Sequence, residues 1–339
     1  MIDPHVHFRD GVQSAKETLQ HGIEVAQLCH FNAFFDMPNT MPPLTDEKAI
    51  LERLERGEAL TKGELFYGVY GGITTDSDQV REMVALHQRL FPRIIGLKMY
   101  AGHSTGRMGI IMVEEQERVY ETLTEGGYRG VLALHCEKEE LLRESPNHSL
   151  ARPPEAEIES IRDQIRLAKK SGFEGTLHIC HISTKASVEL VNEAKRGGLK
   201  ISCGVTPHHT LLNASDSNSK DNLLKMNPPL RQEEDRQALF EALLEGSIDW
   251  VESDHAPHTL QDKREGASGI PGFRGMLLLL KRLMGAGVSL PQLERLFGGR
   301  VCEVFGLELA VKVPTLEQIE IALEGARQSY PWDPYQALH

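Results

Sequence analysis

The sequence predicts a (β/α)₈ barrel, and three observations support that fold class. Short apolar segments alternate with longer amphipathic segments, which is typical of strand–helix units around a parallel sheet. Eight of these apolar segments occur within about 260 residues, and eight parallel strands close such a barrel. The alternative fold is a doubly wound open sheet. Its usual phosphate-binding signals, a GxGxxG after the first strand or a Walker lysine loop, are absent from the sequence.

The expected strands are the short apolar runs. In chain order they are Ile2–His7, Ala33–Met37, Leu65–Gly71, Ile94–Met99, Gly130–His135, Gly175–His181, Lys200–Thr206 and Asp249–Asp254. The expected helices between them are Thr45–Leu60, Asp76–Leu90, Val113–Glu125, Glu155–Lys170, Thr184–Arg196 and Glu233–Glu245. Thr45 is the expected N-cap of the first helix, and Asp46 and Glu47 place negative charge in its first turn, where the helix dipole favours it.

We expect the whole chain, 1–339, to form a single barrel domain with a C-terminal helical extension over about residues 260–339. The expected helices of this extension are Gly269–Met284, Pro291–Leu296 and Thr315–Gln328. The Pro-rich segment Ser145–Pro154 and the Ser/Asp/Asn-rich segment Asn213–Asn222 are expected to be surface loops.

Composition excludes several classes of protein. The chain has 339 residues, 40% hydrophobic and 25% charged, which is ordinary for a globular protein. Its net charge of −12 opposes binding to nucleic acid or anionic lipid, and an anionic substrate would need a locally positive site. The 5 cysteines form no CxxC pair, so reduced thiols in the cytoplasm are expected rather than disulfides. No signal peptide and no membrane-spanning segment are predicted.

The segment Asp3-Pro4-His5-Val6-His7 is the strongest chemical signal. Residues two apart on a strand project to the same side, so His5 and His7 can bind one metal ion inside a barrel. The alternative is a chance HxH in a chain with 15 histidines. Position favours the metal site, because other candidate ligands also fall at or near the C-terminal ends of expected strands, where barrel enzymes place their chemistry. These residues are Lys98, His135, His181 and Asp254.

Four histidines, one carboxylate and one lysine suit two metal ions better than one. An ammonium group has no lone pair for a metal, so Lys98 could ligate only after its neutral amine reacts with CO₂ to form a carbamate. Burial between cations would favour that neutral amine. The alternative is a strand-end lysine that extends to solvent.

Seven motifs, spread over most of the chain, resemble those of the dihydroorotases of the amidohydrolase superfamily, in particular the dihydroorotase domain of the animal multifunctional pyrimidine protein. The motifs are DPHVHFRD at 3–10, MPNT at 37–40, GLKMY at 96–100, HICHISTK at 178–185, VTPHH at 205–209, KMNPPLR at 225–231 and SDHAPH at 253–258. The resemblance implies reversible, zinc-dependent cyclisation of N-carbamoyl-L-aspartate to (S)-dihydroorotate in de novo pyrimidine biosynthesis.

The resemblance also implies the role of each site residue. One zinc ion would be held by His5, His7 and Asp254, a second by His135 and His181, and N6-carboxylated Lys98 would bridge the two. Asp254 would also transfer the catalytic proton. Arg9, Asn39 and His258 would bind the substrate carboxylate, and Asn227 and Ala256 would contact the ring through their main chains.

Simple structural readings remain as alternatives for the substrate residues. Arg9 follows His7 by two residues, and its fork suits a carboxylate, but it could be a surface arginine. Asn39 could be a turn former, and His258 could be a solvated loop histidine. Six further residues are read as core, supporting or structural and are not assigned to the site: His178, Cys180, His103, His208, His209 and His255.

Two departures from the family are expected. Many relatives carry a small β-domain before the first barrel strand and after the last helix, and because the first strand begins at Ile2 this domain is expected to be missing. The loop Ala101–Arg107 differs from the threonine-bearing loop of relatives, so either Ser104 or Thr105 could meet the substrate.

Two functional alternatives also stay open. One is a hydantoinase-like or allantoinase-like cyclic amidase, which need not keep Arg9, Asn39 and His258. The other is a non-catalytic scaffold for a transcarbamoylase. The expected ligand is a small molecule, carbamoyl aspartate or dihydroorotate, with no nucleic acid and no membrane partner. A homodimer and an association with aspartate transcarbamoylase are both compatible with the sequence.

Overall fold

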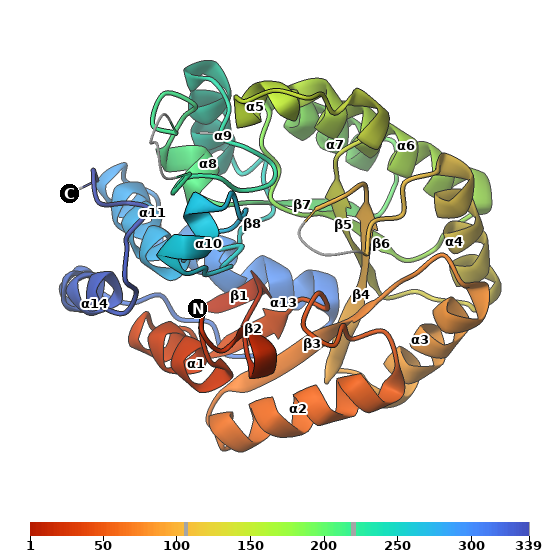
Figure 1. Ribbon diagram of the computed structural model, residues 1–339, viewed down its shortest axis with the longest axis horizontal. Helices are drawn as coiled ribbons and strands as arrows, with labels where there is room; N and C mark the ends of the chain where they lie inside the picture. The colour runs from red at the N-terminus through yellow and green to blue at the C-terminus, as the bar shows by residue number, and fades with distance from the viewer. Residues whose placement is uncertain (105–107, 218–221, 339) are drawn as a thin grey trace.

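The eight predicted strands form one parallel sheet in chain order, which confirms the barrel (Figure 1). The computed structural model describes residues 1–104, 108–217 and 222–338. The strands are β1 (Ile2–Val6), β2 (Ala33–Asp36), β3 (Phe66–Gly72), β4 (Ile94–Ala101), β5 (Val131–Cys136), β6 (Thr176–Ile179), β7 (Ile201–Val205) and β8 (Trp250–Val251). Every strand in the described ranges belongs to this sheet.

The sheet closes between its first and last strands through the segment that follows β8. Val6 forms a parallel bridge with His255, and the His7 N–H donates to the His255 carbonyl at 2.7 Å. The Ser253 N–H donates to Asp3 Oδ1 at 3.1 Å across the same seam. The residues around Asp254 therefore complete the barrel as well as its C-terminal rim.

Helices surround the sheet, as expected of βα units (Figure 1). The main helix after each strand is, in chain order, α1 (Leu19–Leu28), α2 (Glu47–Thr61), α3 (Ser77–Leu90), α4 (Val113–Glu125), α6 (Pro154–Ser171), α7 (Lys185–Arg196), α9 (Glu233–Glu245) and α11 (Phe273–Gly285). Short or C-terminal helices are α5 (His148–Ala151), α8 (Pro207–Leu211), α10 (Leu260–Arg264), α12 (Leu290–Glu294), α13 (Arg300–Phe305) and α14 (Leu316–Gln328). Helix α14 packs against α1 and α11.

Five helices of the described residues were not predicted, namely α1, α5, α8, α10 and α13. Helix α1 contains Gly22, which lowers helix propensity; a Cβ at this position would lie 2.4 Å from a Phe8 ring carbon, so close packing requires the glycine. The expected loop Ser145–Pro154 contains the single turn α5, where the Asn147 side chain accepts hydrogen bonds from the backbone of Ser149 and Leu150.

The strand ends that carry candidate ligands also differ from expectation. The run Gly175–His181 leaves the ladder after Ile179, and Asp249–Asp254 leaves it after Val251. His181 and Asp254 have φ values of 37° and 48°, in the left-handed region that side chains with a Cβ seldom occupy. The strained backbone at both residues is typical of functional positions.

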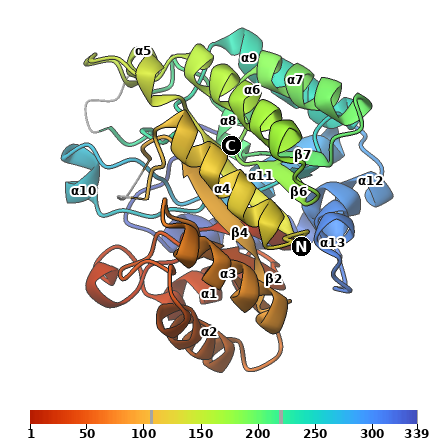
Figure 2. The same ribbon diagram turned by 90° about the vertical axis from the view of Figure 1, so that its right-hand side faces the viewer.

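The N-terminal end of the barrel is filled by apolar side chains. Val301 and Phe305 of α13 pack with interior residues of the strands in one buried cluster. The Phe305 ring centroid lies 5.4 Å from that of Phe35, 6.3 Å from Tyr70 and 6.1 Å from Trp250. Figure 2 shows α13 beside the N-terminus, at the end of the barrel opposite α10. The polar interior positions therefore gather at the C-terminal end.

The N-cap of α2 is Asp46 rather than Thr45, which corrects the sequence prediction. Asp46 Oδ1 accepts from the Ala49 N–H at 2.9 Å. Thr45 belongs to the preceding turn, where its N–H donates to the Pro43 carbonyl and its own carbonyl accepts from Gln79.

We expect Asp46→Ala to lower the free energy of unfolding by about 1 kcal/mol, the usual cost of removing such a cap. Chemical denaturation measures the change. Thr45→Ala, which removes no cap hydrogen bond, is the matched control and is expected to change stability by less than about half as much. Equal losses in the two variants would contradict the assignment of the cap.

Among the helices of the described residues, none combines the length and the apolar character needed to span a membrane.

Candidate active site

A cavity of about 380 Å³ opens at the C-terminal ends of the strands and collects most of the predicted site residues. Its lining residues are His5, His7, Arg9, Asn39, Lys98, Tyr100, Ser104, His135, His181, Asn227, Asp254, Ala256, Ser268 and Gly269. The predicted residue His258 is not in this lining, and Thr105 lies outside the residues that the structure describes. The sequence did not single out Tyr100, Ser268 or Gly269.

His5, His7 and Asp254 converge on one point. His5 Nε2 and His7 Nε2 are 3.2 Å apart, and Asp254 Oδ1 lies 3.3 Å and 3.0 Å from them. Donor atoms on one tetrahedral zinc ion lie about 3.3 Å apart. The three buried side chains therefore have the spacing of metal ligands, and they form one of the groups of buried donors that could hold an ion.

Without a metal, His7 and Asp254 have protonation states that suit a bound cation, whereas the pKa of His5, despite its burial, is raised to about 10 by Cys180 and Glu252. Burial lowers the pKa of His7 to about 4, so its imidazole is neutral and keeps a lone pair. Burial alone would raise the pKa of Asp254, but the hydrogen bond from His7 and the positive charge of His5 hold that pKa well below its usual range. His5 lies between Asp254 on one side and Glu252 on the other, at 3.3 and 3.4 Å.

A second pair of histidines lies beside the first group. His135 Nδ1 and His181 Nε2 are 3.1 Å apart, and the ring centroids of His5 and His181 are 5.2 Å apart. Burial lowers the pKa of both His135 and His181, so both imidazoles are neutral. Glu137, itself bound by Arg152, lies 3.1 Å from His135 Nε2, the arrangement by which carboxylates orient histidines that ligate metals.

Lys98 lies inside the barrel, where its charge acts on His5, His135 and His181. Its side chain is fully buried, so a lysine extending to solvent is ruled out. Nζ is 3.1 Å from Cys180 Sγ and 5.0 Å from the centroid of the Tyr100 ring. Among the described residues no carboxylate oxygen is recorded within 4.0 Å of this ammonium. Lys98 therefore lies near members of both histidine groups.

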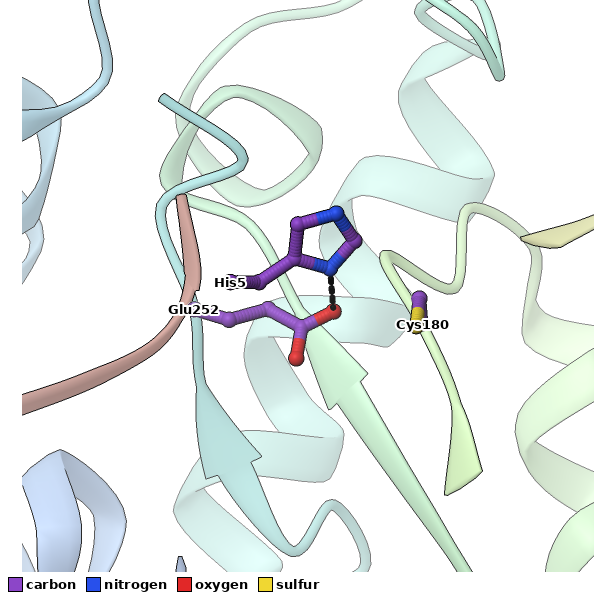
Figure 3. Close-up of side chains that lie close together, drawn as sticks. All are labelled: His5, Cys180 and Glu252. Atoms are coloured by element: carbon purple, nitrogen blue, oxygen red, sulfur yellow. Dashed lines mark ion pairs between the residues drawn. The ribbon is translucent and has the colours of Figure 1, made fainter. Parts of the chain in front are cut away.

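Cys180 and Glu252 also reach this interior. Cys180 was predicted to be a core residue, and Glu252 was not predicted to belong to the site. Figure 3 shows them with His5, whose Nδ1 lies 3.4 Å from Glu252 Oε1. The three donor atoms lie within 4.8 Å of one another. Burial would raise the pKa of Cys180, but the charges of Lys98 and His5 lower it to about 5. The spacing of two residues from Asp254 could have revealed Glu252.

Glu252 has a structural role as well. It lies 3.0 Å from His178 Nε2 and accepts hydrogen bonds from the Trp250 indole at 2.9 Å and from the His181 N–H at 2.5 Å. His178 stacks on Trp250 with ring centroids 4.2 Å apart. His178 is therefore a core residue, as predicted, and Glu252 fixes the backbone of the candidate ligand His181.

Of the three predicted carboxylate-binding side chains, two line the cavity. Arg9 is buried, which rules out a surface arginine, and its Nε donates to the Pro257 carbonyl at 3.4 Å. Asn39 Oδ1 lies 2.6 Å from His7 Nδ1, so this residue also orients a candidate ligand. His258 is buried rather than solvated, burial lowers its pKa to about 3, and its carbonyl accepts from the Trp332 indole at 2.9 Å.

Asn227 and Ala256 also line the cavity. Asn227 Oδ1 lies 2.9 Å from His148 Nε2, and the Ala256 N–H donates to the Ile270 carbonyl at 2.9 Å. Ser104, from the loop after β4, lies in the cavity lining as well. The cavity lining thus combines metal-type donors, a buried guanidinium and the residues expected to offer main-chain groups.

Solved structures share the architecture of this chain. An L-hydantoinase from Arthrobacter aurescens superposes with a TM-score of 0.79 at 23% identity, covering 90% of this chain and 70% of that one. A dihydroorotase from Saccharomyces cerevisiae, solved with 5-fluoroorotic acid, superposes with a TM-score of 0.73 at 18% identity, covering 91% and 84%. The fold is therefore that of the amidohydrolase barrels.

Curated relatives identify the family. A dihydroorotase from Lactobacillus johnsonii is 33% identical over 341 residues, covering 95% of this chain and 77% of that protein. Dihydroorotases from Thermococcus kodakarensis and Pyrococcus furiosus are 36% and 33% identical, covering 83% and 91% of this chain. The chain belongs to the dihydroorotase family. It spans 61% and 66% of the lengths of these two archaeal relatives, and no family model matches it.

Proposed function

We propose that this protein is a dihydroorotase, which catalyses the reversible cyclisation of N-carbamoyl-L-aspartate to (S)-dihydroorotate in pyrimidine biosynthesis. The observation that carries this proposal is the placement of the buried Arg9 in the same cavity as the His5, His7 and Asp254 cluster. No ion pair within 4.0 Å is recorded between Arg9 and a described carboxylate, although the charges of Glu17, Asp36 and Asp254 act on it. The substrate in both directions carries a carboxylate.

Two zinc ions fit the donor sets. His5, His7 and Asp254 would hold one ion and His135 and His181 the other, with N6-carboxylated Lys98 bridging them. When bound, zinc polarises an amide carbonyl and lowers the pKa of water. The converging donor atoms and the lowered pKa values of His7, His135 and His181 support this assignment, as does the buried position of Lys98.

The chain's own residues would position the substrate and transfer the proton. Asp254, an ionised carboxylate facing the cavity, would accept a proton from the attacking water and return it to the ring nitrogen during hydrolysis. In the direction of cyclisation it would remove the amide proton. Arg9, Asn39 and His258 would bind the substrate carboxylate, with Asn227 and Ala256 contacting the ring.

The alternative within the class is a hydantoinase-like amidase, which the hydantoinase among the structural neighbours brings forward. That enzyme would not need Arg9. A scaffold without activity is disfavoured because the described site brings together all six candidate metal ligands. Homodimer formation, association with aspartate transcarbamoylase and the choice of Ser104 or Thr105 stay predictions.

We expect Arg9→Met to lower kcat/KM for dihydroorotate strongly, because a charge-assisted hydrogen bond to the substrate carboxylate contributes roughly 1.5–3 kcal/mol, or about 10- to 150-fold. Dihydrouracil, the same ring without the carboxylate, should be affected little. Steady-state hydrolysis of both compounds by wild type and variant measures the difference. Wild type should prefer dihydroorotate by a wide margin.

The matched control is Arg118→Met, which removes an exposed arginine from α4. It should leave both rates unchanged. Equal losses on the two rings would show that Arg9 supports the site as a whole rather than the carboxylate. A wild-type preference for dihydrouracil would refute the proposed function and move the assignment to a hydantoinase-like amidase.

A further inference from the structure

Lys263 is a buried cation that the proposed reaction does not use. It lies on α10, and its side chain is among the largest that are fully buried. Nζ donates to three main-chain carbonyls, those of Lys225 at 2.8 Å, Ala267 at 2.8 Å and Gly269 at 2.9 Å. An ammonium has three donors, so this set satisfies all of them. We call these three carbonyls with Nζ the Lys263 cage.

The cage has no acidic partner. No ion pair between Lys263 and a carboxylate is recorded within the described part of the chain, and burying a charge without such a partner is costly unless hydrogen bonds replace its water. Burial and, to a smaller extent, the charge of the nearby Lys225 lower the pKa of Lys263 to about 7. An apolar side chain would fill the same space without the cost of burying a charge. The buried ammonium therefore indicates a role beyond packing.

The carbonyls in the cage belong to the two segments that form one wall of the cavity. Asn227 lies in the first segment, and Ser268 and Gly269 lie in the second. The segments are joined further by the Gly269 N–H, which donates to the Lys225 carbonyl at 2.9 Å, and by Ser268 Oγ, which donates to Asn227 Oδ1 at 3.3 Å. Lys263 is therefore the common anchor of that wall.

The segment that contains Ser268 and Gly269 also contacts Ala256, in the loop that follows β8. Gly269 has a φ of 129°, and a Cβ there would lie 2.7 Å from the Ala256 carbonyl. The Ala256 N–H donates to the Ile270 carbonyl. The positions of Asn227 and Ala256, the expected ring contacts, thus both depend on segments that the cage holds.

We propose that Lys263 is a positioning residue that sets the substrate affinity of this site, by tying the 225–228 and 267–270 segments together so that their main-chain groups face the ring. The inference rests on the proposed function for its substrate. Its structural part, the anchoring of the two segments, stands without it.

The test compares Lys263→Met with wild type in the metal-loaded full chain at about pH 6, below the pKa of the ammonium. Methionine fills similar space but donates no hydrogen bond. We expect KM for dihydroorotate to rise about tenfold or more, while kcat changes less than about threefold and metal content is unchanged. Lys263→Arg, which keeps the charge and the donors, should recover most of the affinity.

Hydrogen exchange gives a readout without substrate. In Lys263→Met the amides of Gly269 and Ala256 should exchange faster, while those of β4 and β5 keep their protection. Lys16→Met, which removes a cation near Asp262 outside the cage, is the matched control and should change neither KM nor exchange. If Lys263→Met fails to fold, Lys263→Gln is measured against the same criteria.

The outcomes separate the two proposals. Unchanged exchange at Gly269 and Ala256 overturns the anchoring role, whatever the activity. Faster exchange with an unchanged KM overturns the link to substrate affinity, and an equal loss in kcat and metal content shows general structural damage instead. If wild type does not hydrolyse dihydroorotate, the proposed function fails, and the exchange result still decides the anchoring role.

Discussion

Lys98→Ala is expected to reduce activity by more than about 10²-fold, because loss of a residue that merely orients a metal ligand already costs 10- to 100-fold. Wild type should bind about two divalent ions per chain, mainly zinc, and the variant fewer. Short carboxylic acids such as acetate should restore part of the activity by filling the space of the missing carbamate. Metal analysis and hydrolysis of dihydroorotate, with and without acetate, measure these effects.

The control for Lys98→Ala is Lys281→Ala, which removes an exposed lysine of α11 that pairs with Glu320. It should keep both metal and activity. Wild-type activity with a full metal complement in Lys98→Ala would disprove the bridging role. If activity is lost and acetate does not restore it, the metal content of Lys98→Ala decides the question. The bridging role requires that content to be lower than in wild type.

Asp254→Asn is expected to lower kcat by about 10²–10⁴-fold, the usual scale for a general acid–base group, when both ions are retained. The amide has nearly the same shape as the carboxylate but cannot accept the proton. Metal content must be measured in the same preparation, because Asp254 lies within 3.3 Å of two candidate ligands. Asp78→Asn, an exposed change at the start of α3, is the control. A loss below about tenfold with both ions bound would argue against proton transfer by Asp254.

Much of the fold was predictable because it depends on local patterns. Each buried strand is a short apolar run between turn residues, and the helices α4 and α9 begin and end at the predicted residues. The candidate ligands His135 and His181 were predictable for a related reason. A polar residue at the end of an apolar strand projects at the rim where all eight strands meet.

The rest depended on contacts between distant segments. Glu252 and Cys180 sit in apolar runs, and only the closed barrel brings their donor atoms to His5. In the sequence Lys263 cannot be told from an exposed lysine of a short surface helix. Its buried position depends on the carbonyls of Lys225 and Gly269, which lie in segments before and after it. Helix α1 was missed because Gly22 weakens the local signal, while the reason for that glycine, Phe8, lies on another element.

The seam between β1 and β8 has a consequence for the whole molecule. His7 follows the first strand and Asp254 follows the last, and few ladder bonds join these two edges directly. Any ligand held by both side chains must bind the closed barrel and not an opened one. Such a ligand stabilises closure by mass action, in proportion to the logarithm of its concentration relative to its dissociation constant. Occupancy of the site and integrity of the barrel are therefore thermodynamically linked, and opening of the seam would take the cluster apart.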